Sequence, residues 1–114
     1  MTTIDINKQI PQENWLEFFD TFTDGNRGRH IKIELLDPEL GDEELIKDAP
    51  LFSINYDPVD KGNDIMIETG GEAPTYAHTI DVPTEVWTGQ DANGVVLALR
   101  ITSKDTQAII TFQP

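Results

Sequence analysis

The chain has 114 residues, of which 38% are hydrophobic and 25% are charged, and it contains no cysteine. These values are typical of one globular domain with its own hydrophobic core, and the lack of cysteine excludes disulfides, thiol catalysis and cysteine-ligated metal centres. Because 21 acidic residues stand against 8 basic ones, the net charge is −13, which repels nucleic acids and anionic membranes and excludes both as general partners.

Residues 1–9 are predicted to form a tail or, at most, a short edge strand at Ile4 and Ile6. They lack the apolar core of a signal peptide. No later run approaches the roughly 20 apolar residues that a membrane span requires. We therefore expect a cytoplasmic protein.

An amphipathic helix is predicted for residues 11–23, with the sequence PQENWLEFFDTFT. Pro11 suits the first turn, where its missing N–H costs nothing, and Gly25 is predicted to follow the end of the helix. The apolar arc of the helix comprises Trp15, Leu16, Phe18, Phe19 and Phe22, and the opposite side carries Glu13, Glu17 and Asp20. Since a helix this short is only marginally stable alone in water, we expect its apolar arc to be buried on a sheet.

From His30 onward, apolar and polar residues alternate with a period of two, which indicates β-strands. A first strand is predicted at 31–35, and residues 37–50 are predicted as a long loop or one short helical turn around 42–46. Further strands are predicted at 52–56, 65–67, 76–82, 86–88, 95–102 and 108–112, of which 95–102 is expected to be the longest.

Turn-forming residues separate these strands at 60–63, 70–71, 91–94 and 104–107. Most connections are too short for a helical crossover, so neighbouring strands are expected to be antiparallel. The predicted fold class is α+β, mainly β. We expect a single domain, residues 1–114, in which the N-terminal helix packs on a curled six- or seven-stranded antiparallel sheet or partial barrel formed by residues 30–112.

The chain has two histidines, His30 and His78. His78 shares its strand face with Ile80, so we expect a structural histidine on the apolar face or its rim. The alternative is a general base that works with Asp81 or Glu85.

His30 lies beside Arg27 and Arg29 at the start of a strand. We interpret these three residues as local charge balance in an acidic protein. The alternative is a small basic spot that binds an anion.

Asp57, Gly62 and Glu68 occupy positions 1, 6 and 12 of a calcium-loop pattern. Val59 and Lys61 stand where two further ligands belong, so a polar hairpin turn is the preferred interpretation. The glycines follow no phosphate-binding spacing. We therefore expect no metal, no cofactor and no enzymatic activity.

Several segments, taken in order, resemble a bacterial family catalogued as domain of unknown function 5335. They are Ile10-Pro11, Trp15, Phe18-Phe19-Asp20 and Phe22 in the helix, IKIELLDPELG at 31–41, Ala49-Pro50-Leu51 with Ile54, HTIDVPTEV at 78–86, and the strand pair around 97–103 and 109–112. The stretch TDGNRGRH after Phe22 departs from the family pattern. The resemblance implies a small stand-alone bacterial protein, and it implies no reaction, cofactor or partner.

The negative charge, which is most concentrated from Glu34 to Asp48, favours a non-enzymatic accessory or interaction protein. Such a protein would use its acidic surface or an exposed sheet edge to bind a protein partner or a second copy of itself. The first alternative is a small-molecule-binding domain with a pocket between helix and sheet. The candidate pocket or interaction residues are Tyr56, Tyr76, His78, Trp87 and Arg100. The second alternative is an enzyme that uses His78 with Asp81 or Glu85.

Overall fold

The computed structural model describes residues 4–113, so the first three residues of the predicted N-terminal tail lie outside the described part. The elements are β1 (Ile6–Ile10), η1 (Gln12–Asn14), α1 (Trp15–Asn26), β2 (His30–Asp37), β3 (Gly41–Asp57), η2 (Val59–Lys61), β4 (Asp64–Thr69), β5 (Tyr76–Asp81), β6 (Glu85–Gln90), β7 (Val96–Ser103) and β8 (Thr106–Phe112).

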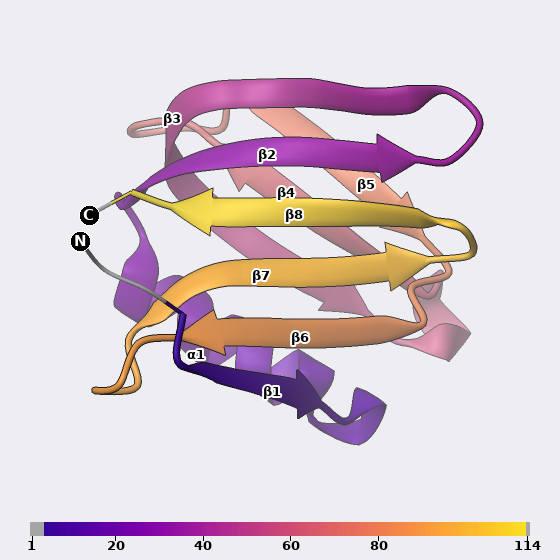
Figure 1. Ribbon diagram of the computed structural model, residues 1–114, viewed down its shortest axis with the longest axis horizontal. Helices are drawn as coiled ribbons and strands as arrows, with labels where there is room; N and C mark the ends of the chain where they lie inside the picture. The colour runs from indigo at the N-terminus through magenta and orange to yellow at the C-terminus, as the bar shows by residue number, and fades with distance from the viewer. Residues whose placement is uncertain (1–3, 114) are drawn as a thin grey trace.

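All strand pairs are antiparallel, and the strands follow the order β1-β6-β7-β8-β2-β3-β4-β5 (Figure 1). The predicted fold class is confirmed: one helix packs on a large, curled antiparallel sheet that does not close, as in a partial barrel. The sheet has eight strands because the N-terminal segment forms an edge strand, β1, beside β6.

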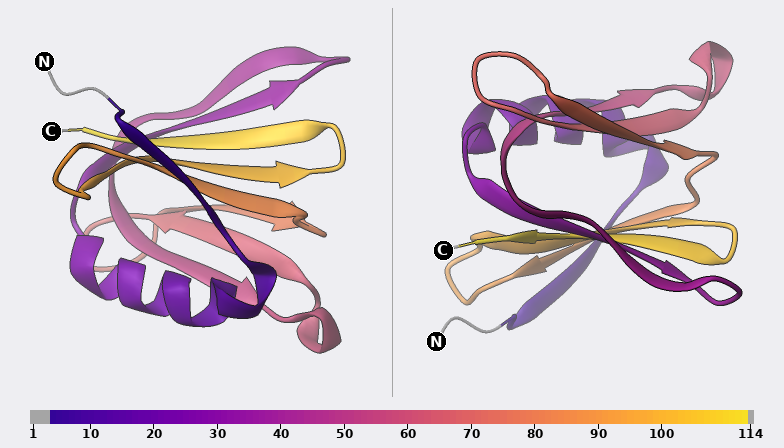
Figure 2. Two further views of the ribbon diagram at one scale, coloured as in Figure 1. Left: turned by 60° about the horizontal axis from the view of Figure 1, so that its bottom comes forward. Right: turned by 90° about the horizontal axis from the view of Figure 1, so that it is seen from above.

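Strand β3 bends and joins two layers of the sheet (Figure 2). Its first part, up to Pro50, pairs with β2, and its second part, from Leu51, pairs with β4. Register shifts occur on both sides of the bend, between Ile31 and Ile33 of the β2 ladder and between Leu51 and Ser53. Such irregularities bend a strand and increase its twist. They allow β3 to leave the larger layer and continue into the smaller layer with β4 and β5.

The prediction of a loop or helical turn over residues 37–50 is wrong. Residues 38–40 form the turn, and β3 begins at Gly41, so β3 rather than 95–102 is the longest strand. The acidic run 42–44 hid this strand, because Asp and Glu are poor strand formers and show no alternation. Pairing with β2 overrides that preference, since the side chains of 42–44 are exposed and need no apolar neighbours.

Helix α1 lies alongside the second part of β3 and covers one of its edges (Figure 2). The hydroxyl of Thr23 donates to the Ile54 carbonyl and accepts from the Ile54 N–H, both at 3.0 Å. The Arg27 Nε donates to the Phe52 carbonyl at 2.9 Å. These bonds pair the backbone groups of Phe52 and Ile54, which would otherwise lie unpaired along an open edge of the sheet. Proteins normally protect such edges.

The apolar arc of α1 is buried as predicted, with one exception. Trp15, Phe19 and Phe22 enter the core, and Phe18 packs against it. Leu16, however, is 47% exposed, because it lies outside the side of the helix that faces the sheet. The bounds of the predicted helix, 11–23, are shifted. Residues 12–14 form the 3-10 turn η1, α1 begins at Trp15, and the helix continues through Gly25 to Asn26, because the chain reverses only at Gly28, whose φ is +94°.

The core contains most of the residues predicted to face inward. Fully buried aliphatic side chains from both layers meet the helix; they are Ile31, Ile33, Leu51, Ile54, Ile65, Ile67, Val86, Leu99, Ile101 and Ile110. Val82 and Val95 were expected in strands, but both lie just outside strand ends and are exposed. In residues 4–113 we find no helix with the length and apolarity needed to cross a bilayer.

Candidate functional site

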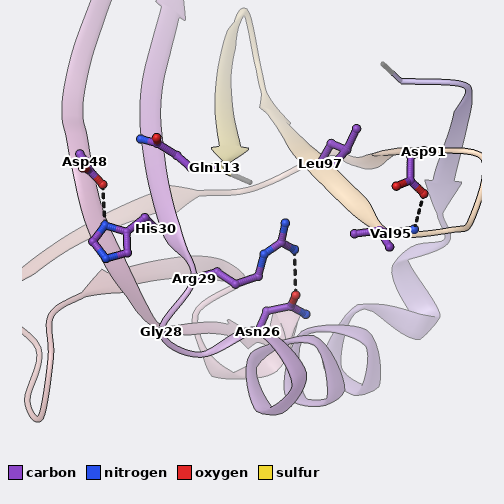
Figure 3. A pocket seen from close by; sticks show the side chains of 9 residues that line it. All are labelled: Asn26, Gly28, Arg29, His30, Asp48, Asp91, Val95, Leu97 and Gln113. Atoms are coloured by element: carbon purple, nitrogen blue, oxygen red, sulfur yellow. Dashed lines mark hydrogen bonds and ion pairs between the residues drawn. The ribbon is translucent and has the colours of Figure 1, made fainter. Parts of the chain in front are cut away.

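A hollow of about 780 Å³ lies where the α1–β2 turn, β3, the β6–β7 turn and the end of β8 meet (Figure 3). This volume falls within the range of ligand pockets. The lining residues are Asn26, Gly28, Arg29, His30, Asp48, Asp91, Val95, Leu97 and Gln113.

The α1–β2 turn places Arg29 in this hollow. Gly28 adopts a positive φ that favours glycine, and its N–H donates to the Leu51 carbonyl at 2.9 Å. The Leu51 N–H donates in return to the Arg29 carbonyl at 2.8 Å. This exchange anchors the turn to the bend of β3 and fixes where the Arg29 side chain begins.

Arg29 is held on one side only. Its Nη1 donates to the Asn26 side-chain oxygen and to the Val96 carbonyl, both at 3.0 Å, and its guanidinium carbon lies 4.7 Å from the centroid of the Phe112 ring. Burial lowers the pKa of Arg29 from its ordinary value, but a guanidinium stays protonated at neutral pH. Figure 3 shows its free end directed into the space between Gln113 and Leu97.

The two carboxylates that line the hollow have other partners. Asp48 accepts from, or ion-pairs with, the Nδ1 of His30 at 2.7 Å, and both side chains are exposed. One oxygen of Asp91 accepts from the backbone N–H groups of Asn93 and Val95 at 2.9 and 3.0 Å, which fixes the β6–β7 turn. Neither carboxylate comes within ion-pair distance of Arg29, and the two ion pairs found in residues 4–113 do not involve it.

A second groove of about 630 Å³ runs along α1 next to β1 and shares Asn26 with the hollow. Its apolar floor includes Ile10, Phe18 and Phe22, and its rim includes Lys8 and Glu17. This groove lies between helix and sheet, where a small-molecule pocket was expected, although none of the five predicted site residues lines it.

The β2–β3 hairpin forms the outer edge of the larger layer of the sheet, next to β8, and its turn lies at the same end as the turn between β7 and β8 (Figure 1). We call residues 34–48 the acidic hairpin, because they contain seven carboxylates and one lysine. Leu40, in its turn, is 87% exposed. Within the described residues the first part of β3 pairs with β2 alone, so its outer edge from Gly41 to Ala49 is unpaired in the ladder, whereas the Pro50 carbonyl accepts from the Gly70 N–H at 3.0 Å.

Two comparisons with known proteins cover almost the whole chain. Residues 6–114 match the model of a family described as a family of unknown function, DUF5335. The chain belongs to this family. An uncharacterized protein of Aquifex aeolicus (strain VF5) is 27% identical over 108 residues, which cover 94% of this chain and 92% of that protein. No solved structure matches.

The five residues predicted to form a pocket or interaction site do not gather in one place in this DUF5335 protein. Trp87 and Arg100 are cross-strand neighbours on the face of β6 and β7 away from the core, and the guanidinium carbon lies 5.5 Å from the Trp87 ring centroid. Tyr56 belongs to the core and packs edge-on against Trp15. Tyr76 is half-buried on the edge strand β5.

His78 lies on β5, at a smaller hollow of about 270 Å³ beside the β7–β8 hairpin. Burial lowers the pKa of His78, and the charge of Glu43 partly opposes that change. Asp81 lies three residues further along the same strand and therefore on the other face. Within residues 4–113, His78 has no hydrogen bond to Asp81 or Glu85.

Three aspartates, Asp57, Asp64 and Asp81, stand directly opposite one another on β3, β4 and β5. Burial and the charges of its two neighbours raise the pKa of Asp64. The interpretation of this segment as a polar hairpin turn is confirmed, because residues 58–63 connect β3 to β4. The described part of the chain contains no group of three His, Cys, Asp or Glu residues arranged to hold a metal ion.

Sequence reasoning did not identify the hollow around Arg29. His30 and Arg29 were singled out, but Asp91 was taken only as a turn residue. The hollow combines segments that are far apart in the chain, and no local pattern connects them. One signal was present: an arginine in a stretch with few acidic neighbours, TDGNRGRH, within a strongly acidic chain.

Proposed function

We propose that this DUF5335 protein is a non-enzymatic accessory protein that binds a basic protein partner through the acidic hairpin. The observation that supports this proposal is the concentration of seven carboxylates and one lysine on a hairpin at the outer edge of the larger layer, with one edge of β3 unpaired. Its net charge of −6 is almost half of the total of −13. A charge field of this kind attracts a basic surface and speeds its association.

A basic partner suits this edge better than a second copy of the chain. Asp42, Glu43 and Glu44 follow one another along the unpaired part of β3, so two such edges would place like charges opposite each other. Like charges directly opposite destabilise a strand pair, and charged edges are a common protection against self-association. Exposed Leu40 offers an apolar contact next to these charges.

Two sets of substitutions that change the net charge equally test the proposal. The hairpin variant carries Glu39→Gln, Asp42→Asn, Glu43→Gln and Glu44→Gln. The control variant carries Glu13→Gln in η1 and Glu17→Gln, Asp20→Asn and Asp24→Asn on the exposed side of α1. All eight side chains are exposed, and each set changes the net charge from −13 to −9.

Each immobilised variant is incubated with a lysate of the organism that carries the chain, and the captured proteins are quantified by mass spectrometry at low and high salt. We expect the wild type and the control variant to capture the same basic proteins at low salt and the hairpin variant to lose them. High salt is expected to release these proteins. Equal capture by the two variants would contradict the proposal, because it would assign any binding to net charge alone.

A further inference from the structure

Arg29 is a half-buried cation with unused hydrogen-bond donors. In a chain with 21 acidic residues, its Nε and Nη2 bond to none of the residues 4–113, whereas Nη1 is fixed by Asn26 and Val96. Removing a charge from water is costly unless it gains a partner. The stacking on Phe112 and the two Nη1 bonds position the group, and its remaining donors face the hollow.

The carboxylates near Arg29 are occupied elsewhere, so an anionic ligand need not displace them. Asp48 is engaged by His30, and Asp91 is engaged by two backbone N–H groups of its own turn. The hollow also offers an apolar wall, since Val95 is exposed and Leu97 half-exposed.

These features select one class of anion. A guanidinium presents its donors as a planar fork that matches the two oxygens of a carboxylate. A doubly charged phosphate or phosphonate would meet one arginine together with the negative charges of Asp48 and Asp91. We infer that the hollow binds a small organic monocarboxylate, with its carboxylate on the free side of Arg29 and its apolar part against Val95 and Leu97.

Carboxylate binding at this position does not depend on the proposed partner binding. Apart from Asp48, the side chains of the hollow lie outside the acidic hairpin. The hairpin variant described above retains Asp48 and is therefore expected to bind carboxylates like the wild type.

The test titrates the full, isotope-labelled chain with acetate, hexanoate and benzoate and follows the amide and arginine Nε–H signals by NMR. We expect saturable shifts of the Arg29 Nε–H and of backbone amides at 28–30 and 93–97. Hexan-1-ol, which lacks the carboxylate, is expected to cause none of the Arg29 shift, and hexylphosphonate as a dianion is expected to bind more weakly than hexanoate.

Substitutions of Arg29 and Arg27 test whether Arg29 is the residue that binds the carboxylate. Arg29→Gln is expected to weaken hexanoate binding by about tenfold to a hundredfold, the effect of losing a charged hydrogen-bond partner. Arg27→Gln is the matched control, because Arg27 also bonds a carbonyl and stacks on a phenylalanine but lies outside the hollow. It is expected to bind hexanoate like the wild type.

A second variant keeps the test decisive if Arg29→Gln does not fold. Leu97→Glu places a carboxylate in the hollow and is expected to abolish hexanoate binding while the chain stays folded. Leu97→Gln removes the same apolar contact without adding a charge, so it is expected to weaken hexanoate binding much less than Leu97→Glu does. Any one of three results would overturn the inference. They are no saturable shift with any of the three carboxylates, equal Arg29 shifts with hexanol and hexanoate, and unchanged binding in folded Arg29→Gln or Leu97→Glu.

Discussion

The Thr23 hydroxyl connects helix α1 to strand β3, and we predict that its loss destabilises the fold. It is buried and bonds both the N–H and the carbonyl of Ile54, a residue with no exposed surface. Thr23→Val keeps the shape of the side chain but leaves both backbone groups buried without a partner. Each such group costs about 1–3 kcal/mol, so we expect the free energy of unfolding to fall by about 2–6 kcal/mol.

The assay is urea and thermal unfolding followed by circular dichroism. With about 4 °C per kcal/mol for a chain of this size, Tm should fall by roughly 8–24 °C. Thr23→Ser is the control, because it retains the hydroxyl and loses one methyl group, worth about 1 kcal/mol. If Thr23→Val proved as stable as Thr23→Ser, the hydroxyl would not be what holds the helix on the edge of β3.

Three further predictions concern stability. Trp15 is buried, so Trp15→Ala should lower the free energy of unfolding by about 3–5 kcal/mol in a urea titration. Leu16 is exposed, so Leu16→Ala should lower it by less than about 1 kcal/mol. Equal losses in the two variants would contradict the observed orientation of the helix. Gly70→Ala should lower the free energy of unfolding by on the order of 2 kcal/mol, because the φ of Gly70 is +151° and an added Cβ would clash with backbone atoms of residues 73–75. A Cβ added at Gly71 would meet no atom, so Gly71→Ala should leave the free energy of unfolding nearly unchanged in the same assay. Asp64→Asn should be more stable than the wild type at pH 7. Since the folded state raises the pKa of Asp64, ionisation of this side chain opposes folding. The advantage of Asp64→Asn should therefore fade as the pH falls through the raised pKa of the folded state and be lost below the ordinary aspartate value; an advantage that grew at low pH would refute the sign.

The alternation of apolar residues predicted the part of the fold that lies in the core. Ile65 and Ile67 are buried because a two-residue period leaves one face of a strand for the other layer and the helix. The same signal failed at 42–44, where the strand is held by backbone bonds to β2 and its side chains need no buried face. A strand that is held only by backbone hydrogen bonds to its neighbour need not show an alternation of apolar and polar residues in its own sequence.

The candidate site was less accessible to sequence reasoning. The pairing of Trp87 with Arg100 follows from the register of β6 and β7, but the sequence does not specify that register. Arg29 is brought to Val96 and Phe112 only when the larger layer assembles β2, β7 and β8. Pockets built from several distant turns depend on such long-range pairing, and local patterns cannot supply it.

The unpaired edge of β3 gives the most direct measurement of the proposed partner binding. Hydrogen–deuterium exchange compares the free chain with the chain bound to a basic protein recovered in the capture experiment. Partner binding at the acidic hairpin predicts slower exchange of amides within 41–50 and unchanged exchange at the other edge strands, 6–10 and 76–81. Protection confined to β1 or β5, or to the helix, with residues 41–50 unaffected, would contradict the assignment of partner binding to the acidic hairpin.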